Sequence, residues 1–141
     1  MKILSKRGLL ALMFASMALF TTQAFEASDA PSPLRQEGDT LIVNTKDIAA
    51  DIKGFRGDTP LNIYISDGKV VKVEALSNRE TPRFFDRVRN SLLDAWNGLT
   101  VSQAKKQQVD GVTGATYSSK AVIATVQRGL EFYDKTVKDG K

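Results

Sequence analysis

The sequence predicts an α+β fold, in which helices pack on one face of a small antiparallel β-sheet. Two observations predict it. A β-hairpin pattern occupies residues 61–76, and two amphipathic helical patterns follow it, at 82–96 and 118–133. The chain has 141 residues, of which 42% are hydrophobic and 26% are charged, so it is long enough for one globular domain.

The first 24 residues have the three-part pattern of a secretory signal peptide. Basic residues at positions 2–7 precede an apolar run at 8–20, and small side chains at 22–24 suit cleavage after Ala24. We therefore expect residues 1–24 to be removed and the protein to be periplasmic or otherwise exported. An uncleaved membrane anchor is the alternative, although the apolar run is shorter than the roughly 20 residues that a span needs.

Composition excludes several classes of protein. The sequence has no His and no Cys, which rules out disulfides, zinc-finger spacings, Cys nucleophiles and Ser-His-Asp triads. Redox or group-transfer chemistry would therefore need an imported cofactor or a site made of carboxylates alone. The formal net charge of +4 depends on the predicted signal peptide, since 17 basic and 16 acidic residues remain without it. Nothing in this balance indicates nucleic-acid binding.

The rest of the chain divides into a leader, a domain and a tail. Residues 25–38 contain two prolines and few apolar side chains, which predicts a flexible leader. The folded domain is expected over 39–135, beginning with a short strand at 40–43 that is rich in β-branched residues. The Lys-rich residues 136–141 are predicted to be a disordered tail.

The hairpin has the clearest local signal. Two apolar runs, 61–65 and 69–76, flank an Asp67-Gly68 turn, and Gly accepts the positive φ that tight turns need. Alternation in the second run predicts one buried and one solvated face. The side chains expected on the buried face are Val71, Val73 and Ala75.

Both helices have an apolar face. The first is expected to begin at Pro82 and to end at Asn97-Gly98. The second is expected over 118–133, with Ser118 or Ser119 as its N-cap. The predicted core positions are Phe85, Val88, Leu92 and Trp96 in the first helix, and Val122, Ile123, Val126, Leu130 and Tyr133 in the second.

The segment between the helices, residues 109–120, is rich in Gly and hydroxyl side chains and leads directly into a helix. Glycines allow a close approach of the backbone to a ligand, and a helix N-terminus favours a phosphate. Asp110 is expected to cap the turn or to position a hydroxyl. An ordinary capped loop without a ligand is the alternative.

Residues 110–116, Asp-Gly-Val-Thr-Gly-Ala-Thr, resemble the flavinylation motif of the FMN-binding domain family. That family includes flavin-carrying subunits of the sodium-translocating NADH:quinone reductase and of the Rnf electron-transport complex. The resemblance implies FMN attached by a phosphoester to Thr116, placed there by an FAD:protein FMN transferase. The other residues it implies at the cofactor are Asp110, Gly111, Thr113, Gly114, Ala115 and Ser118.

Two further matches occur in the same order as in the family. Gly54-Phe-Arg-Gly57 before the hairpin resembles the family's opening, and Glu80-Thr81-Pro82 matches a Glu-Thr-Pro whose Glu80 and Thr81 are implied to lie beside the flavin. Relatives continue with Gly-Leu-Gly, where this chain has Arg83-Phe84-Phe85. Phe84 is expected either to stack on the flavin ring or to join the core. Tyr117, which replaces an aliphatic residue, either covers the ring or lies on the surface.

The resemblance implies an exported flavoprotein electron carrier that passes electrons between a redox donor and an acceptor, with possible contact to a membrane redox complex. Ser118, Ser119 and Lys120 are expected near the phosphoester. Two other functions stay open. One is a small flavin-dependent reductase with its own electron acceptor. The other is a non-redox adaptor domain.

Overall fold

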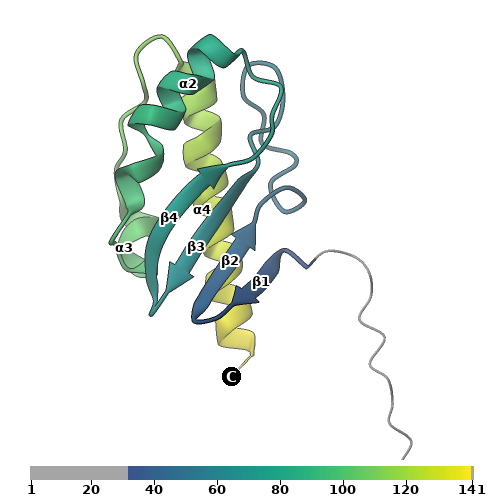
Figure 1. The fold of residues 1–141 in the computed structure, drawn as a ribbon, viewed down its shortest axis with the longest axis vertical. Helices are drawn as coiled ribbons and strands as arrows, with labels where there is room; N and C mark the ends of the chain where they lie inside the picture. Colours follow the sequence, from purple (N-terminus) through teal and green to yellow (C-terminus); the bar gives the residue numbers. More distant parts are fainter. Residues whose placement is uncertain (1–31, 141) are drawn as a thin grey trace, which may run out of the picture. The chain divides into compact units, whose positions relative to one another are not determined.

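A computed structural model describes residues 32–140, which form a four-stranded antiparallel sheet and a set of helices (Figure 1). The predicted signal peptide and residues 25–31 lie outside the described residues. The sheet order follows the chain: β1 (Leu34–Glu37), β2 (Thr40–Asn44), β3 (Leu61–Ser66) and β4 (Lys69–Ala75). The predicted α+β class is confirmed.

Strand β1 corrects the predicted leader, which is wrong for residues 34–37. This segment pairs with β2 from Leu34 opposite Val43 to Glu37 opposite Thr40. Gly38, at φ 57°, lies in the two-residue turn between the strands. Most side chains of β1 are exposed, so backbone pairing rather than apolar alternation makes it a strand.

The predicted hairpin of β3 and β4 is confirmed. Asp67 and Gly68 have φ values of 52° and 70°, the two positive values that a type I′ turn requires. The predicted burial of Val71 is wrong. The register shifts between Tyr64 and Ile65, so that Val70 faces Ile65 in the core and Val71 is 53% exposed. The bulge adds one residue to β4, so that two successive side chains, Val71 and Lys72, are both exposed.

Four helical elements follow the sheet: α2 (Pro82–Ser91), the 3₁₀ helix η2 (Leu93–Trp96), α3 (Val101–Lys106) and α4 (Thr116–Asp139). Figure 1 shows α4 running along one face of the sheet. The core lies between them. Its largest fully buried side chains include Leu61, Ile63 and Ile65 of β3 and Val122, Val126 and Leu130 of α4.

The first predicted helix is interrupted. Its α-helical part, α2, ends at Ser91, and η2 continues the chain to Trp96. All four side chains predicted for its core face are buried: Phe85, Val88, Leu92 and Trp96. Helix α3 was not predicted. It begins with a capping box in which the Thr100 hydroxyl accepts from the Gln103 amide at 3.1 Å.

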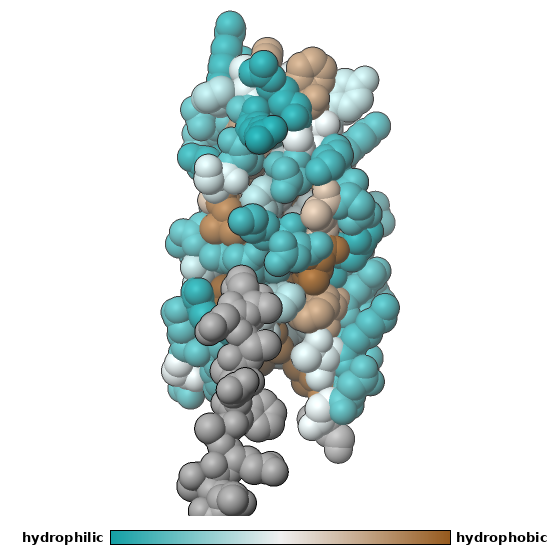
Figure 2. Space-filling view, turned by 90° about the vertical axis from the view of Figure 1, so that its right-hand side faces the viewer, coloured by the Kyte–Doolittle hydropathy of each residue, from teal (hydrophilic) through white to brown (hydrophobic). Residues whose placement is uncertain are grey.

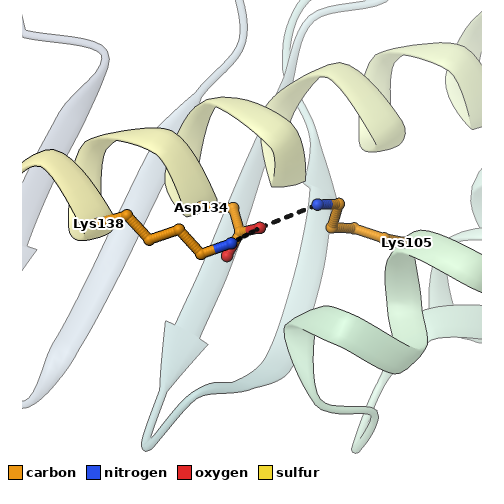
Figure 3. Close-up of polar contacts among 3 residues, drawn as sticks. All are labelled: Lys105, Asp134 and Lys138. Atoms are coloured by element: carbon orange, nitrogen blue, oxygen red, sulfur yellow. Dashed lines mark hydrogen bonds and ion pairs between the residues drawn. The ribbon is translucent and has the colours of Figure 1, made fainter.

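Helix α4 is longer than predicted at both ends. Ile123 and Tyr133 of the predicted stripe are half-buried rather than buried. The predicted disordered tail is wrong for residues 136–139, which continue the helix. Asp134 explains this extension, because it accepts hydrogen bonds from Lys105 of α3 at 2.9 Å and from Lys138 one turn on at 3.0 Å (Figure 3).

A glycine lets α4 approach the sheet closely. A Cβ atom on Gly129 would lie 2.5 Å from Ile63 Cδ1 and 3.0 Å from Thr45 Cγ2. A glycine in a helix interior normally destabilises it, so its presence here reflects the packing. Within residues 32–140, no helix combines the length and the apolar character needed to cross a membrane.

Candidate functional site

A pocket of about 250 Å³ lies where α2 and α4 begin, at the upper end of the molecule in Figure 1. Three segments far apart in the sequence line it. They contribute Phe55, then Glu80, Thr81 and Phe84, then residues 114–118. Ligand cavities usually measure about 300–1,000 Å³, so this one is suited to part of a larger ligand.

The carboxylate of Glu80 joins these segments. Its Oε1 accepts from the backbone N–H of Arg56 at 2.7 Å and of Gly57 at 3.1 Å. Its Oε2 accepts from the N–H of Phe55 at 3.1 Å and from the Ser118 hydroxyl. Glu80 is 5% exposed, and these four donors satisfy the carboxylate that burial has removed from water.

The same donors set the protonation state of Glu80. Burial raises the pKa of a carboxyl, but here the hydrogen bonds from Ser118 and from the amides of residues 55–57 outweigh it and hold the pKa of Glu80 below its usual range. The side chain is therefore an anion at neutral pH. It is not suited to serve as a general acid.

Gly54 makes this arrangement possible by close approach. A Cβ atom there would lie 2.8–2.9 Å from the three carboxyl atoms of Glu80. Gly57, at the other end of the loop, has no such restriction, since the nearest atom to its Cβ would be Arg79 Cβ at 3.7 Å. The Gly-x-x-Gly pattern therefore has one glycine that the packing requires.

Thr116 is the first residue of α4, and its side chain is exposed at the pocket. The first helical hydrogen bond runs from Ser119 N to Ala115 O at 2.9 Å. The N–H groups of residues 116–118 consequently have no backbone acceptor among the described residues. Such free donors at a helix N-terminus favour a phosphate group.

The loop before Thr116 is held by Ser119. The Ser119 hydroxyl donates to Ala115 O at 2.7 Å and accepts from Val112 N at 2.9 Å. Gly111 packs close by, since its Cβ would lie 3.4 Å from Ser119 Cβ. Gly114 has a φ of 81°, and a Cβ there would lie 2.9 Å from Arg87 Nη1. The guanidinium of Arg87 therefore lies against the motif.

The structure brings together six of the predicted site residues and leaves three outside the pocket lining. Those in the lining are Glu80, Thr81, Gly114, Ala115, Thr116 and Ser118. Asp110, Gly111 and Thr113 lie on the preceding loop. The side-chain hydrogen bonds that hold this loop in the described structure come from Ser119, and neither role predicted for Asp110, capping the turn or positioning a hydroxyl, is seen within residues 32–140.

Ser118 and Ser119 do not cap α4 as predicted. The helix begins two residues earlier, at Thr116, and its N-cap residue is Ala115, which has no side-chain cap. Both serine hydroxyls bind protein groups instead, at Glu80 and at Ala115 O. The cation beside the motif in the described structure is Arg87, which the sequence did not indicate because α2 lies far from the motif in the chain.

Three aromatic side chains surround the pocket. Phe55 is 71% exposed, Tyr117 67% and Phe84 41%. The rings of Phe55 and Tyr117 are 5.9 Å apart at an angle of 43°. Phe84 lines the pocket, and the core position belongs to its neighbour Phe85. Figure 2 shows a mostly hydrophilic face, with moderately hydrophobic side chains at the upper end and more strongly hydrophobic ones at mid-height and below.

Residues 54–131 match the FMN-binding domain family, a range that contains every segment of the pocket and more than half of the chain. The chain belongs to this family. The matched range begins at the loop that holds Glu80 and ends within α4. The predicted resemblance is confirmed.

Curated relatives are named as the G component of an ion-translocating oxidoreductase complex. The protein from Shewanella piezotolerans is 28% identical over 113 residues, which cover 71% of this chain and 52% of the relative. The protein from Aliivibrio fischeri is 31% identical over 93 residues, covering 57% and 44%. That from Stutzerimonas stutzeri is 33% identical over 79 residues, covering 48% and 35%. The matched region spans about half or less of these relatives.

The residues of the pocket fit FMN. Unpartnered N–H groups and Arg87 suit its phosphate, and the aromatic lining suits its planar ring. Within the described part of the chain, no cluster of acidic side chains is suited to a metal ion. The N–H groups, Arg87 and the aromatic lining together match an anionic ligand with a planar ring.

Proposed function

We propose that this FMN-binding domain is an exported electron carrier whose FMN is attached by a phosphoester to Thr116. The observation that supports it is the exposed Thr116 hydroxyl, at the start of α4 and at the edge of an aromatic pocket. FMN supplies reversible electron transfer when bound. The chain's own residues bind and orient it.

The attachment requires an enzyme. A bond forms between Thr116 Oγ1 and the phosphorus of the FMN half of FAD, while the phosphoanhydride bond breaks and AMP leaves with the bonding electron pair. The hydroxyl proton passes to a base of the FMN transferase. A Thr hydroxyl is a weak nucleophile without an activating base, and this sequence has no His to provide one. Thr116 is therefore the acceptor and not the catalyst.

The phosphoester retains one negative charge, and the protein offers it two kinds of partner. The N–H groups of residues 116–118 point from the N-terminus of α4, where the helix dipole adds partial positive charge. Arg87 lies against Gly114, two residues before the attachment site, and a guanidinium forms paired hydrogen bonds with phosphate oxygens. Lys120 is exposed on the next turn.

The partners are a redox donor and an acceptor. The names of the relatives, which are components of an ion-translocating oxidoreductase complex, support a redox complex as the source or the destination of the electrons. The signal-peptide pattern of residues 1–24 supports a periplasmic location. Covalent attachment suits an exported protein, because a dissociable cofactor would be lost outside the cytosol.

Co-expression of the full chain with an FMN transferase in an exporting host tests the attachment. We expect an intact mass that starts at residue 25 and includes one FMN, and yellow fluorescence that persists in a denaturing gel. Thr116→Ala should abolish both flavin signals, and Thr116→Ser should keep them. Thr136→Ala, an exposed Thr on the same helix, is the matched control. Flavin-free wild-type protein, from cells whose transferase modifies another substrate, would contradict the proposal.

A second measurement separates a carrier from a reductase. Flavin-loaded protein should be reduced by a strong chemical donor and reoxidised by a quinone or a redox protein, with one flavin's electrons transferred per protein. Sustained turnover of a small-molecule substrate by the isolated protein would instead indicate a reductase. If the protein folds and is exported but contains no flavin, the non-redox adaptor domain is the remaining function.

A further inference from the structure

The pocket gathers most of the exposed apolar surface of the described residues. Four large hydrophobic side chains are exposed, and three of them, Phe55, Phe84 and Tyr117, line this one pocket. The fourth, Val71, lies on β4. Scattered exposed apolar residues are ordinary, whereas three aromatic rings around one cavity indicate a ligand surface.

Two of these rings are positioned by one carboxylate oxygen. Oε2 of Glu80 accepts from the backbone N–H of Phe55 and from the hydroxyl of Ser118, the residue after Tyr117. The loop that carries Phe55 and the helix turn that carries Tyr117 are separated by more than 60 residues in the chain. The Glu80 carboxylate therefore links the loop of Phe55 to the first turn of α4, two segments that are distant in the sequence.

We propose that Phe55 and Tyr117 form the wall against which the flavin ring lies, and that Glu80 is a positioning residue that holds this wall together. The proposal rests on the proposed function and deepens it. It assigns Glu80 a role that the resemblance did not: its oxygens bind the protein's own donors rather than the flavin.

The geometry favours a wall for a planar ligand. The two rings are 5.9 Å apart and tilted by 43°, in contact with each other but open to the pocket. Aromatic rings attract in offset or tilted arrangements, and a third ring system placed beside them gains further contact. Glu80 stays an anion among its four donors, so the wall keeps its spacing across neutral pH.

Flavin emission measures this contact directly. A phenol close to an excited flavin donates an electron and quenches the emission, whereas a benzene ring does not. We compare the emission per attached flavin in the folded protein with that of the same sample after denaturation, so that the extent of attachment does not enter. Wild-type protein should emit several-fold less when folded.

Variants of Tyr117 test the wall. Tyr117→Phe keeps the ring but removes the phenol, and Tyr117→Leu removes the ring. Both should raise the folded-state emission several-fold, and Tyr117→Leu should also change the visible circular dichroism of the flavin. Tyr133→Phe, on α4 but outside the pocket, is the matched control and should leave the emission ratio unchanged. An unchanged ratio in both Tyr117 variants would overturn the proposal.

Variants of Glu80 and Ser118 test the positioning role. Glu80→Gln replaces one carboxylate oxygen with an amide NH₂ that cannot accept, and Ser118→Ala removes one donor without changing charge. Each should raise the emission ratio although Tyr117 is intact, and Ser118→Thr should restore it. If Glu80→Gln does not fold, Ser118→Ala still gives the answer.

The outcomes distinguish this inference from the proposed function. Emission that responds to Tyr117 but not to Glu80 or Ser118 would overturn the positioning role. A wild-type protein whose mass shows no flavin would refute the proposed function, and this inference with it. Attached flavin with emission that no variant changes would leave the proposed function standing and refute only the wall.

Discussion

Glu80 illustrates how a single residue depends on one glycine. The carboxylate lies directly against the backbone of the 54–57 loop, so the loop can reach it only where no Cβ intervenes. A side chain at position 54 would push the loop away and leave hydrogen-bond donors and a buried anion without partners. Unpaired buried charge is among the costliest changes a protein can undergo.

Gly54→Ala should therefore lower the free energy of unfolding by about 1–3 kcal/mol, the usual cost of forcing extra atoms into a packed site. Gly57→Ala is the matched control, because its Cβ would lie 3.7 Å from the nearest atom, Arg79 Cβ, which is an ordinary contact distance. Urea unfolding followed by circular dichroism measures both. Equal stability of the two variants would show that the loop yields at no cost.

The sequence located the family's motif, but it could not assemble the pocket. Residues 110–116 are contiguous, so their motif is visible in a single chain segment. The contacts of Glu80 join residues that are 23–25 and 38 positions away, and Arg87 approaches Gly114 across two elements. Such long-range contacts leave no periodic or local signal. They depend on how the helices pack.

Among the elements, α4 has the clearest conflict between intrinsic preference and packing. Ala in place of a helix-interior Gly stabilises a helix by about 1 kcal/mol. At Gly129, however, the added Cβ would lie 2.5 Å from Ile63 Cδ1, a distance at which atoms must move. Overpacking of this kind costs about 1–3 kcal/mol. The packing cost therefore equals or exceeds the gain in helix propensity over this range.

Gly129→Ala is thus expected to destabilise the protein despite the better helix former. Ile63→Val removes the clashing Cδ1 atom and should on its own cost about 0.5–1.5 kcal/mol. The double variant should be more stable than the sum of the two single changes predicts, as a double-mutant cycle by urea unfolding will measure. Strict additivity would mean that α4 shifts as a whole instead.

The elements that the sequence predicted share a strong local signal. Asp67-Gly68 encodes its own turn, and the apolar face of α4 repeats over several turns. Strand β1 has no such signal, because its pairing is made by backbone groups. The exposed Val71 also follows from pairing, since only the register with β3 reveals the bulge. Which side chains of a strand are buried therefore depends on its pairing with the neighbouring strand as well as on its own sequence.

At the scale of the whole molecule, the absence of His shapes the dependence of stability on pH. No side chain in the sequence has an ordinary pKa between those of the carboxylates and those of Tyr and Lys. The Tyr64 hydroxyl, which donates to Glu74 at 2.7 Å, has a raised pKa because of this hydrogen bond. In Glu74 the same bond lowers the pKa.

The free energy of unfolding should consequently show a plateau from about pH 6 to pH 9. Glu74, Glu80 and Asp134 have lowered pKa values in the folded state. As the pH decreases below the plateau, the unfolded chain therefore takes up protons first, and the free energy of unfolding decreases. Above pH 10.0, the unfolded chain loses the Tyr64 proton first, and stability falls again as pH rises. Thermal unfolding across the pH range measures the plateau.

Glu80→Gln isolates one part of the acid limb. The stability difference between wild type and variant should be largest above pH 4.5, the ordinary pKa of the carboxyl, and should shrink as the pH falls through the lowered pKa of Glu80. A difference that does not vary with pH would show that the charge of Glu80 contributes nothing, and that shape alone holds the loop.

The hydrogen bonds that hold Glu80 have a consequence for how the sequence of this pocket can vary. Because main-chain amides of residues 55–57 make the contacts, the identities of the side chains at 55 and 56 are not needed for the hold. New side chains can be exchanged there while the scaffold stays as it is. Substitutions at positions 55 and 56 can thereby change the surroundings of the cofactor one residue at a time, without loss of the hydrogen bonds to Glu80.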